Sequence, residues 1–120
     1  MEPKLSQLVE AYVQAINNDD AASFLALFAD NAEVEDIGRE FRGTDAIKAW
    51  SDREIFDVRV TLEVIECTNR DDETVITAKV DGTFDRTSLP DPLILAHYIA
   101  VKGGKIVRLR CRLASEKASG

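Results

Sequence analysis

The stretch VRVTLEV, residues 58–64, decides the fold class, because apolar and polar side chains alternate along its whole length. A period of two is typical of a strand with one face buried and the other in water. Three more stretches of strand character follow, at residues 74–84, 93–101 and 106–113. Turn residues separate them, and Gly103-Gly104 between two lysines indicates a tight hairpin. Four sequential strands joined by turns predict an antiparallel sheet.

The half of the chain before these strands carries helix patterns. Apolar side chains recur at three- and four-residue spacing between residues 5 and 16, which predicts an amphipathic helix. One of the two residues Asp19-Asp20 is expected to cap a short second helix whose inner face reaches Phe28. A short strand pair follows. Thr44 is then expected to cap a third helix with Trp50 on its inner side. The predicted fold class is α+β, with three helices covering one face of the sheet.

Length and composition indicate one globular domain. The chain has 120 residues, of which 45% are apolar and 31% charged, and these values are ordinary for a soluble protein. We expect a single domain over residues 1–114 and a flexible tail over 115–120. The N-terminus lacks the apolar run of a signal peptide, and no stretch is long and apolar enough to span a bilayer. We therefore expect a cytoplasmic protein.

The charge of the chain argues against two classes of partner. Its 22 acidic and 15 basic residues give a formal net charge of -7. An acidic surface repels phosphate backbones and anionic lipid, so we expect neither nucleic acid nor membranes as partners. Arg108, Arg110 and Arg112 alternate with apolar residues, which indicates a basic sheet face in water or at an interface. The two cysteines, Cys67 and Cys111, match no metal spacing, and no metal site is expected.

Asp36 and Tyr12 are the candidate catalytic residues. By strand alternation Asp36 shares a face with Val34, so an inward Val34 places a carboxylate on an apolar face, where it needs a partner or a pocket. The alternative is that the strand ends and Asp36 lies in solvent. Tyr12 lies within the apolar stripe of the first helix, and its hydroxyl would donate to a ligand or merely reach water. His97, the only histidine, alternates away from Ala96 and is expected on the outer face.

Three segments resemble a known superfamily: YVQAIN at residues 12–17, LFADNAEVED at 27–36 and RGTDAI at 42–47. They resemble the nuclear transport factor 2-like superfamily, and within it the SnoaL-like and steroid delta-isomerase branch. The resemblance implies a cone-shaped, curved antiparallel sheet whose three helices enclose a pocket. The segments mark the superfamily well but not the activity, since this fold hosts enzymes, carriers and dimerisation modules.

The resemblance also implies roles for individual residues. Asp36 corresponds to the base that moves a proton, and Tyr12 to a tyrosine of the oxyanion hole. The position of the second, protonated acid is expected to fall on Ala96, which cannot donate a hydrogen bond, and a supporting tyrosine is replaced by Ser51. The residues expected to line the pocket are Val34, Trp50, Ala96, Tyr98, Leu109 and Cys111.

These observations predict a homodimeric protein that binds a small apolar or aromatic molecule and acts as an isomerase or cyclase by proton abstraction next to a carbonyl, with no cofactor and no metal. The dimer is expected to join sheet to sheet, because Ile65, His97, Ile99 and Val101 are expected on the outer face.

One alternative is a non-catalytic ligand-binding or dimerisation module, in which Asp36 would be salt-bridged, for example to Arg39 or Arg42, whereas a catalytic base should face an open cavity with Tyr12 across it. Another is an epoxide hydrolase of the same fold, which would need an Asp-Arg-Asp set inside the pocket, and the adjacent pair Asp85 and Arg86 is the one hint of such a set.

Overall fold

The computed structural model describes residues 6–70, 73–84, 87 and 92–114. The expected tail at 115–120 and the pair Asp85 and Arg86 lie outside these residues. The elements in chain order are α1 (Gln7–Asn17), α2 (Ala21–Ala26), β1 (Phe28–Asp36), β2 (Arg39–Arg42), α3 (Thr44–Ser51), the π-helical turn η1 (Asp52–Phe56), β3 (Thr61–Arg70), β4 (Glu73–Asp81), β5 (Ile94–Lys102) and β6 (Lys105–Leu113).

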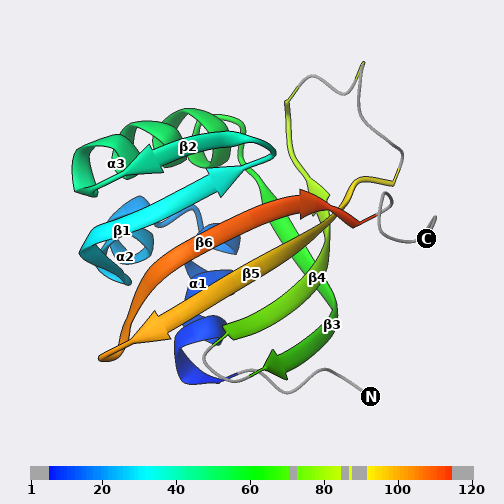
Figure 1. Ribbon diagram of the computed structural model, residues 1–120. Coiled ribbons are helices and arrows are strands. Elements are labelled where there is room, and N and C mark those ends of the chain that lie inside the picture. The colour runs from blue at the N-terminus through cyan, green and yellow to red at the C-terminus, as the bar shows by residue number, and fades with distance from the viewer. Residues whose placement is uncertain (1–5, 71–72, 85–86, 88–91, 115–120) are drawn as a thin grey trace.

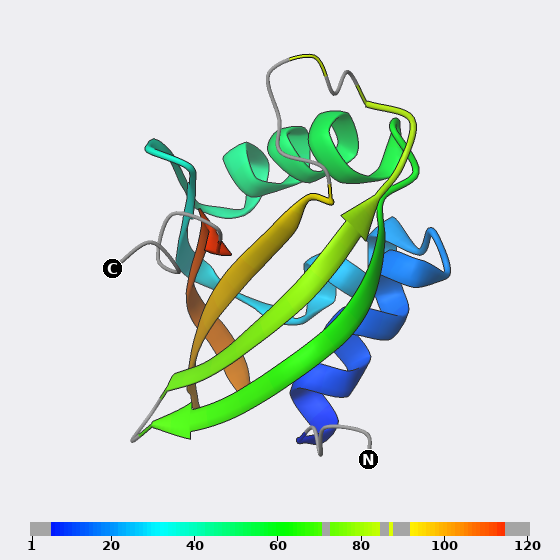
Figure 2. The same cartoon turned by 90° about the vertical axis from the view of Figure 1, so that its right-hand side faces the viewer.

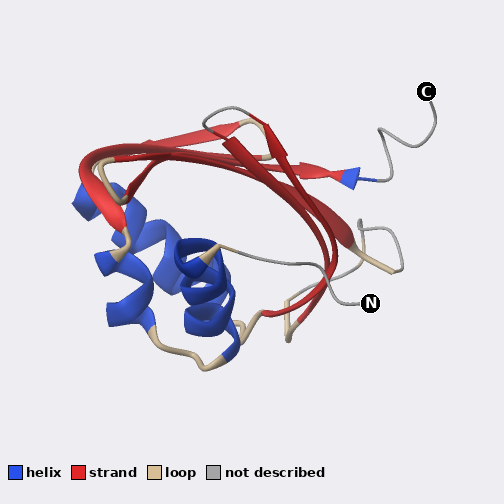
Figure 3. Cartoon of the chain, turned by 90° about the horizontal axis from the view of Figure 1, so that it is seen from below, coloured by secondary structure: helices blue, strands red, loops and turns tan. Residues whose placement is uncertain are grey.

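One six-stranded sheet has the order β2-β1-β6-β5-β4-β3. The four later strands are joined in sequence and are antiparallel, as the alternation predicts. The pairing of β1 with β6 is parallel, so the sheet is mixed rather than wholly antiparallel. The sheet is strongly curved and the helices lie against its concave side (Figures 1 and 3). The predicted α+β class and the curved sheet are confirmed.

Helix α1 packs against β3, which Figure 2 shows side by side with it. Its apolar stripe, including Val9, Tyr12 and Ile16, is buried. The side chain of Asn17, the last residue of the helix, accepts from the backbone N–H of Leu62 at 2.7 Å and donates to its carbonyl at 3.0 Å. This pair of bonds satisfies backbone groups at the first part of β3 and holds the helix against that end of the sheet.

Several element boundaries differ from the sequence prediction. The N-cap of α2 is Asp20, which accepts from Ser23 as expected, but the helix ends at Ala26 and Phe28 already begins β1. Thr44 is the first residue of α3 rather than its cap, and Gly43 takes the cap position without a side-chain bond. The turn η1 delays β3 to Thr61, because a backbone bond from Val60 to Ile55 closes the π-helical segment.

Two β-bulges set which side chains face the helices. In β3, Val64 pairs with Ala78 and Glu66 with Thr77, so Ile65 is the extra residue and is 52% exposed. In the β5–β6 hairpin, Val101 pairs with Ile106 whereas Ala100 pairs with Arg108. One extra residue on one strand reverses the faces of all following pairs relative to a regular hairpin. The second bulge therefore controls which residues of β5 face the pocket.

Candidate functional site

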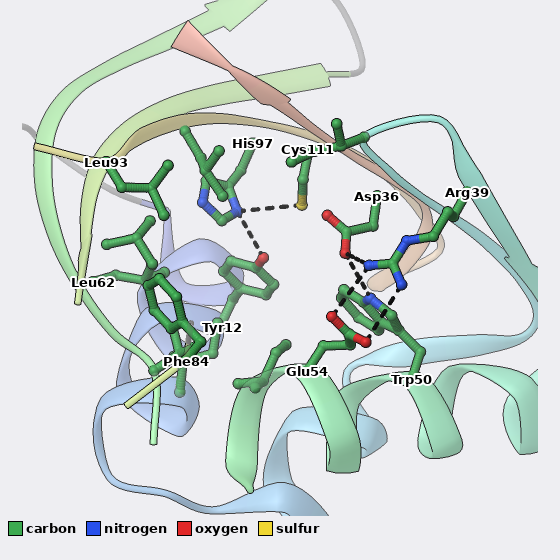
Figure 4. Close-up of a pocket in the computed structure, with 16 residues that line it drawn as sticks. Tyr12, Asp36, Arg39, Trp50, Glu54, Leu62, Phe84, Leu93, His97 and Cys111 are labelled. Atoms are coloured by element: carbon green, nitrogen blue, oxygen red, sulfur yellow. Dashed lines mark hydrogen bonds and ion pairs between the residues drawn. The ribbon is translucent and has the colours of Figure 1, made fainter. Parts of the chain in front are cut away.

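A cavity of about 400 Å³ lies between the concave face of the sheet and the helices (Figure 4). Cavities of this size hold small organic molecules. Its walls are mainly apolar and come from α1, α3, η1 and the sheet. Lining it are Tyr12, Ile16, Asp36, Ile37, Arg39, Trp50, Glu54, Ile55, Val60, Leu62, Val80, Phe84, Leu93, Leu95, His97 and Cys111.

One end of the cavity holds a carboxylate that is anchored on one oxygen. Oδ2 of Asp36 accepts from Nη2 of Arg39 at 2.7 Å and from the indole N–H of Trp50 at 3.1 Å. Among the described residues, Oδ1 of Asp36 has no hydrogen-bond partner, and Figure 4 shows it on the side of Cys111. The side chain is 15% exposed. A carboxylate held by one oxygen keeps the other free to accept a proton.

Arg39 links Asp36 to a second carboxylate. Its Nη2 also donates to Glu54 at 3.2 Å, which makes a carboxylate–guanidinium–carboxylate row along the cavity wall. The hydrogen bond from Arg39 lowers the pKa of Glu54, and the bond to Glu54 raises the pKa of Arg39. Asp36 therefore has a cationic partner. Such an ion pair is what the non-catalytic alternative predicted for Asp36.

A second polar group lies deeper in the cavity. The hydroxyl of Tyr12 lies 2.9 Å from Nδ1 of His97, and Sγ of Cys111 lies 3.7 Å from the same nitrogen. All three side chains are buried. Burial raises the pKa of Tyr12 and of Cys111 well above their ordinary values, and nearby acidic groups add to both shifts. Burial lowers the pKa of His97 to about 4. At neutral pH the cluster is therefore uncharged.

The carboxylate of Asp36 and the cluster around His97 are aligned across neighbouring strands of the sheet. Asp36 on β1 pairs with Cys111 on β6, and Cys111 pairs with His97 on β5. Neighbouring strands lie about 4.8 Å apart, so the backbones of Asp36 and His97 are separated by about 10 Å. This row presents a carboxylate, a thiol and an imidazole to the same cavity.

Of the residues expected to line the pocket, Trp50 and Cys111 do so, as do both candidate catalytic residues, Tyr12 and Asp36. Val34 and Leu109 are buried in the core and are not among the lining residues.

Ala96 and Tyr98 were expected inside, and this expectation was wrong. They pair with Arg112 and Arg110, on the convex face of the sheet. The expectation that His97 lies outside was wrong for the same reason. A regular hairpin around Gly103-Gly104 would pair Ala96 with Cys111, but the bulge shifts that partner to His97.

Among the polar residues that line the cavity, sequence reasoning missed His97, Arg39 and Glu54. No periodic signal separates the faces of β5, because apolar residues occupy both of them. Arg39 and Glu54 are 15 residues apart and meet only because the β1–β2 hairpin folds over η1. The carboxylates that face the arginine row on the convex side are Glu35 and Glu73.

Within the described ranges, no cluster of three or more His, Cys, Asp or Glu side chains could hold a metal ion. Searched over the same ranges, no helix has the length and apolar character that crossing a membrane requires.

The fold agrees with the comparisons to known proteins. The SnoaL-like domain matches residues 9–109, and the chain therefore belongs to the SnoaL-like family, as the resemblance predicted. A Sinorhizobium meliloti protein assigned as a polyketide cyclase is 30% identical, with a TM-score of 0.80 over 90% of this chain and 95% of that one. Among curated proteins, none matches this chain.

More distant structures share the fold. A Catenulispora acidiphila protein with a ketosteroid isomerase-like fold, in complex with trimethylamine, is 19% identical with a TM-score of 0.77, over 91% of this chain and 86% of that one. A Mycobacterium tuberculosis protein in complex with estradiol-17beta-hemisuccinate is 21% identical with a TM-score of 0.73, over 87% of this chain and 88% of that one. Identities at this level show the fold alone.

Proposed function

We propose that the protein binds a small, mainly apolar carbonyl compound in the cavity and moves a proton on the carbon next to the carbonyl, as an isomerase or cyclase does. The observation that carries this proposal is the carboxylate of Asp36, whose Oδ2 is fixed by Arg39 and Trp50 while Oδ1, beside an apolar cavity, has no partner among the described residues. The family membership and the steroid-bound relative in Mycobacterium tuberculosis support a ligand of this class.

The chemistry requires only the side chains present. Oδ1 of Asp36 takes the proton from the carbon, the C–H electrons form a C=C bond, and the carbonyl π electrons move to oxygen. The buried Tyr12–His97 pair is the neutral polar group that receives this oxygen. The protonated Asp36 then returns the proton to the same carbon or to a conjugated one. Fixing Oδ2 holds the base in one orientation, which favours transfer from a bound substrate.

Deuterium exchange tests proton transfer without knowledge of the natural substrate. 1-Tetralone and a β,γ-unsaturated ketosteroid are incubated with the protein in D₂O, and loss of the proton next to the carbonyl is followed by NMR. We expect saturable exchange, reduced at least about a hundredfold in Asp36→Asn. Glu33→Gln is the matched control, because Glu33 lies on the same strand and pairs with Arg42 outside the cavity. Exchange at the same rate in Asp36→Asn would rule out Asp36 as the base, and exchange no faster than in buffer alone would leave the protein a non-catalytic binding module.

A second candidate rests on the row Asp36–Arg39–Glu54. An epoxide hydrolase of this fold would need an Asp-Arg-Asp set inside the pocket, and this row offers the same order of charges with Glu54 in place of the second aspartate. One carboxylate would take a proton from water as the water oxygen bonds to an epoxide carbon, the C–O bond of the epoxide would break, and the resulting alkoxide would take up that proton from the carboxyl group. Incubation of limonene oxide in H₂¹⁸O distinguishes the two functions, because only hydrolysis yields a diol carrying the label.

We also propose a homodimer that joins convex faces of the sheet. Two of the four residues expected there lie on the concave side instead. His97 lines the cavity, and Ile99 is buried in the core. Support comes from other residues: Oε2 of Glu73 and Nε of Arg110 are buried and lack hydrogen bonds in the described structure, although the two side chains form an ion pair of 3.8 Å. A partner surface would satisfy them.

Light scattering at micromolar concentration should give twice the monomer mass of 13.3 kDa. Tyr98→Glu, which adds a charge beside Arg110 on the same face, should shift the mass toward the monomer. A monomer mass for the unmodified chain would contradict the dimer.

We further propose a single domain over residues 1–114 in the cytoplasm, where the free thiols Cys67 and Cys111 stay reduced. Cell fractionation tests the location.

A further inference from the structure

Nε2 of His97 is buried and has no hydrogen-bond partner in the described part of the chain. The other ring nitrogen, Nδ1, faces the hydroxyl of Tyr12 at 2.9 Å. Figure 4 shows Nε2 on the opposite edge of the ring, on the side where Leu93 lies, and both residues line the cavity. A buried polar atom without a partner destabilises the fold unless a ligand or water satisfies it.

Hydrogen-bond accounting decides which nitrogen carries the proton. If the proton is on Nε2, the hydroxyl of Tyr12 donates to Nδ1, and within this pair of side chains Nε2–H alone lacks a partner among the described residues. If the proton is on Nδ1, that group donates to the Tyr12 oxygen. The phenol proton then has no acceptor among the described residues, and the lone pair of Nε2 is unsatisfied as well. The first arrangement leaves fewer buried groups unpaired and is therefore favoured.

Cys111 supports the same arrangement. Its Sγ lies 3.7 Å from Nδ1 of His97, within reach of a weak S–H donor. Burial keeps both the thiol and the phenol protonated. Nδ1 thus faces two hydrogen-bond donors, the phenol O–H and the thiol S–H. An unprotonated Nδ1 can accept from them, whereas an Nδ1–H group could not.

We propose that His97 is held as the Nε2–H tautomer by Tyr12 and that Nε2–H donates the hydrogen bond that binds the oxygen acceptor of the ligand in the cavity. This inference rests on the ligand-binding part of the proposed function. It makes His97 a specificity-determining residue for a carbonyl or ether oxygen. Tyr12 becomes a positioning residue, because its own hydroxyl proton is used on Nδ1.

The tautomer is measured without any ligand. The chain has a single histidine, so the two imidazole ¹⁵N signals in a long-range ¹H–¹⁵N spectrum belong to His97. At pH 7 we expect one pyrrole-type nitrogen at Nε2 and one pyridine-type nitrogen at Nδ1. Tyr12→Phe should convert this spectrum into that of a tautomer mixture. A pyrrole-type Nδ1 in the unmodified chain, or a spectrum unchanged by Tyr12→Phe, would overturn the inference.

Specificity is measured with a matched pair of probes, 1-tetralone and tetralin, which differ in the carbonyl oxygen. Binding is followed by the chemical shifts of cavity residues. We expect tetralone to bind more tightly than tetralin, and His97→Leu to reduce this ratio about tenfold with little effect on tetralin. His97→Gln, which keeps an N–H donor, should restore part of the preference for tetralone.

The outcomes separate this inference from the proposed function. If tetralin and tetralone bind equally to the unmodified chain, the cavity is a ligand site but His97 is not its donor, and only the inference fails. If neither probe shifts any cavity signal, the cavity does not bind ligands of this class, and both fail. If His97→Leu unfolds, the comparison of Tyr12→Phe with the unmodified chain still decides, since loss of the single tautomer should also weaken tetralone binding.

Discussion

The hydroxyl of Tyr12 on α1 and Nδ1 of His97 on β5 lie 2.9 Å apart, in the centre of the molecule and 85 residues apart in sequence. This bond joins α1 to a strand inside the sheet, and both side chains line the cavity. Because both side chains are almost inaccessible to solvent, the bond forms in a medium of low polarity, where an uncharged pair is much more stable than a charged one.

The first prediction concerns the pH dependence of stability. The pKa of His97 is lowered to about 4 in the folded state, against 6.5 for the free side chain. As the pH falls below 6.5, His97 becomes protonated in the unfolded chain but stays neutral in the folded chain. The contribution of His97 to the free energy of unfolding is therefore complete above about pH 6.5 and is lost as the pH falls toward about 4.

At about 1.4 kcal/mol per pKa unit, the loss from this group amounts to about 3 kcal/mol. Urea unfolding of the unmodified chain and of His97→Gln at several pH values measures it. The stability of the variant should fall less over this interval. Parallel curves for the two proteins would contradict a buried, neutral His97.

The second prediction concerns the turn between β1 and β2, where Ile37 lines the cavity. Ile37 has a φ of 46° and Gly38 a φ of 86°, which are the left-handed values of a two-residue hairpin turn. A β-branched residue is strained in this region by about 1–2 kcal/mol, whereas asparagine tolerates it. Ile37→Asn should therefore stabilise the fold by about 1 kcal/mol in urea unfolding.

The same substitution removes an apolar side chain from the cavity wall, so binding of tetralone should weaken while stability rises. Ile37→Val is the control, because it keeps both the strain and the apolar wall. If Ile37→Asn is less stable than Ile37→Val, the packing of the Ile37 side chain stabilises the fold by more than the backbone strain at this position destabilises it.

The third prediction concerns the ion pairs of Arg39. The hydrogen bond from Arg39 is the largest cause of the lowered pKa of Glu54, and Arg53 contributes less. Carboxyl NMR should show the pKa of Glu54 rising in Arg39→Met and rising less in Arg53→Met. Stability should change by less than about 1 kcal/mol in both, since the Arg39 side chain is half exposed. A larger rise in Arg53→Met would mean that Arg39 does not pair with Glu54 in solution.

The fourth prediction concerns Ala96, the position at which the resemblance expected the second acid. Ala96 pairs with Arg112 on the convex face, so Ala96→Asp should leave deuterium exchange of tetralone unchanged. His97→Asp, in contrast, alters the cavity wall itself and should change both exchange and binding. A gain of exchange in Ala96→Asp alone would show that β5 presents its other face to the cavity.

These residues show what the sequence could predict and why. Alternation along β1 placed Asp36 with Val34, since no bulge separates the two residues, and the apolar stripe of α1 placed Tyr12 inward. Both inferences needed only local periodicity. The face of His97 depended on one extra residue in β6, which periodicity does not reveal because both faces of β5 are apolar. The ion pairs of Arg39 depended on tertiary contacts between β2 and η1, which no spacing rule encodes.

The central claim is that a carbonyl compound enters the cavity beside Asp36, and the indole of Trp50 reports on it most directly. The chain has one tryptophan, whose N–H donates to Asp36 at the cavity wall, so its ¹H–¹⁵N spectrum contains a single indole signal. Titration with 1-tetralone should move this signal saturably, together with the imidazole signals of His97. An indole signal that stays in place while tetralone saturates other residues, or no saturable shift at all, would contradict the account.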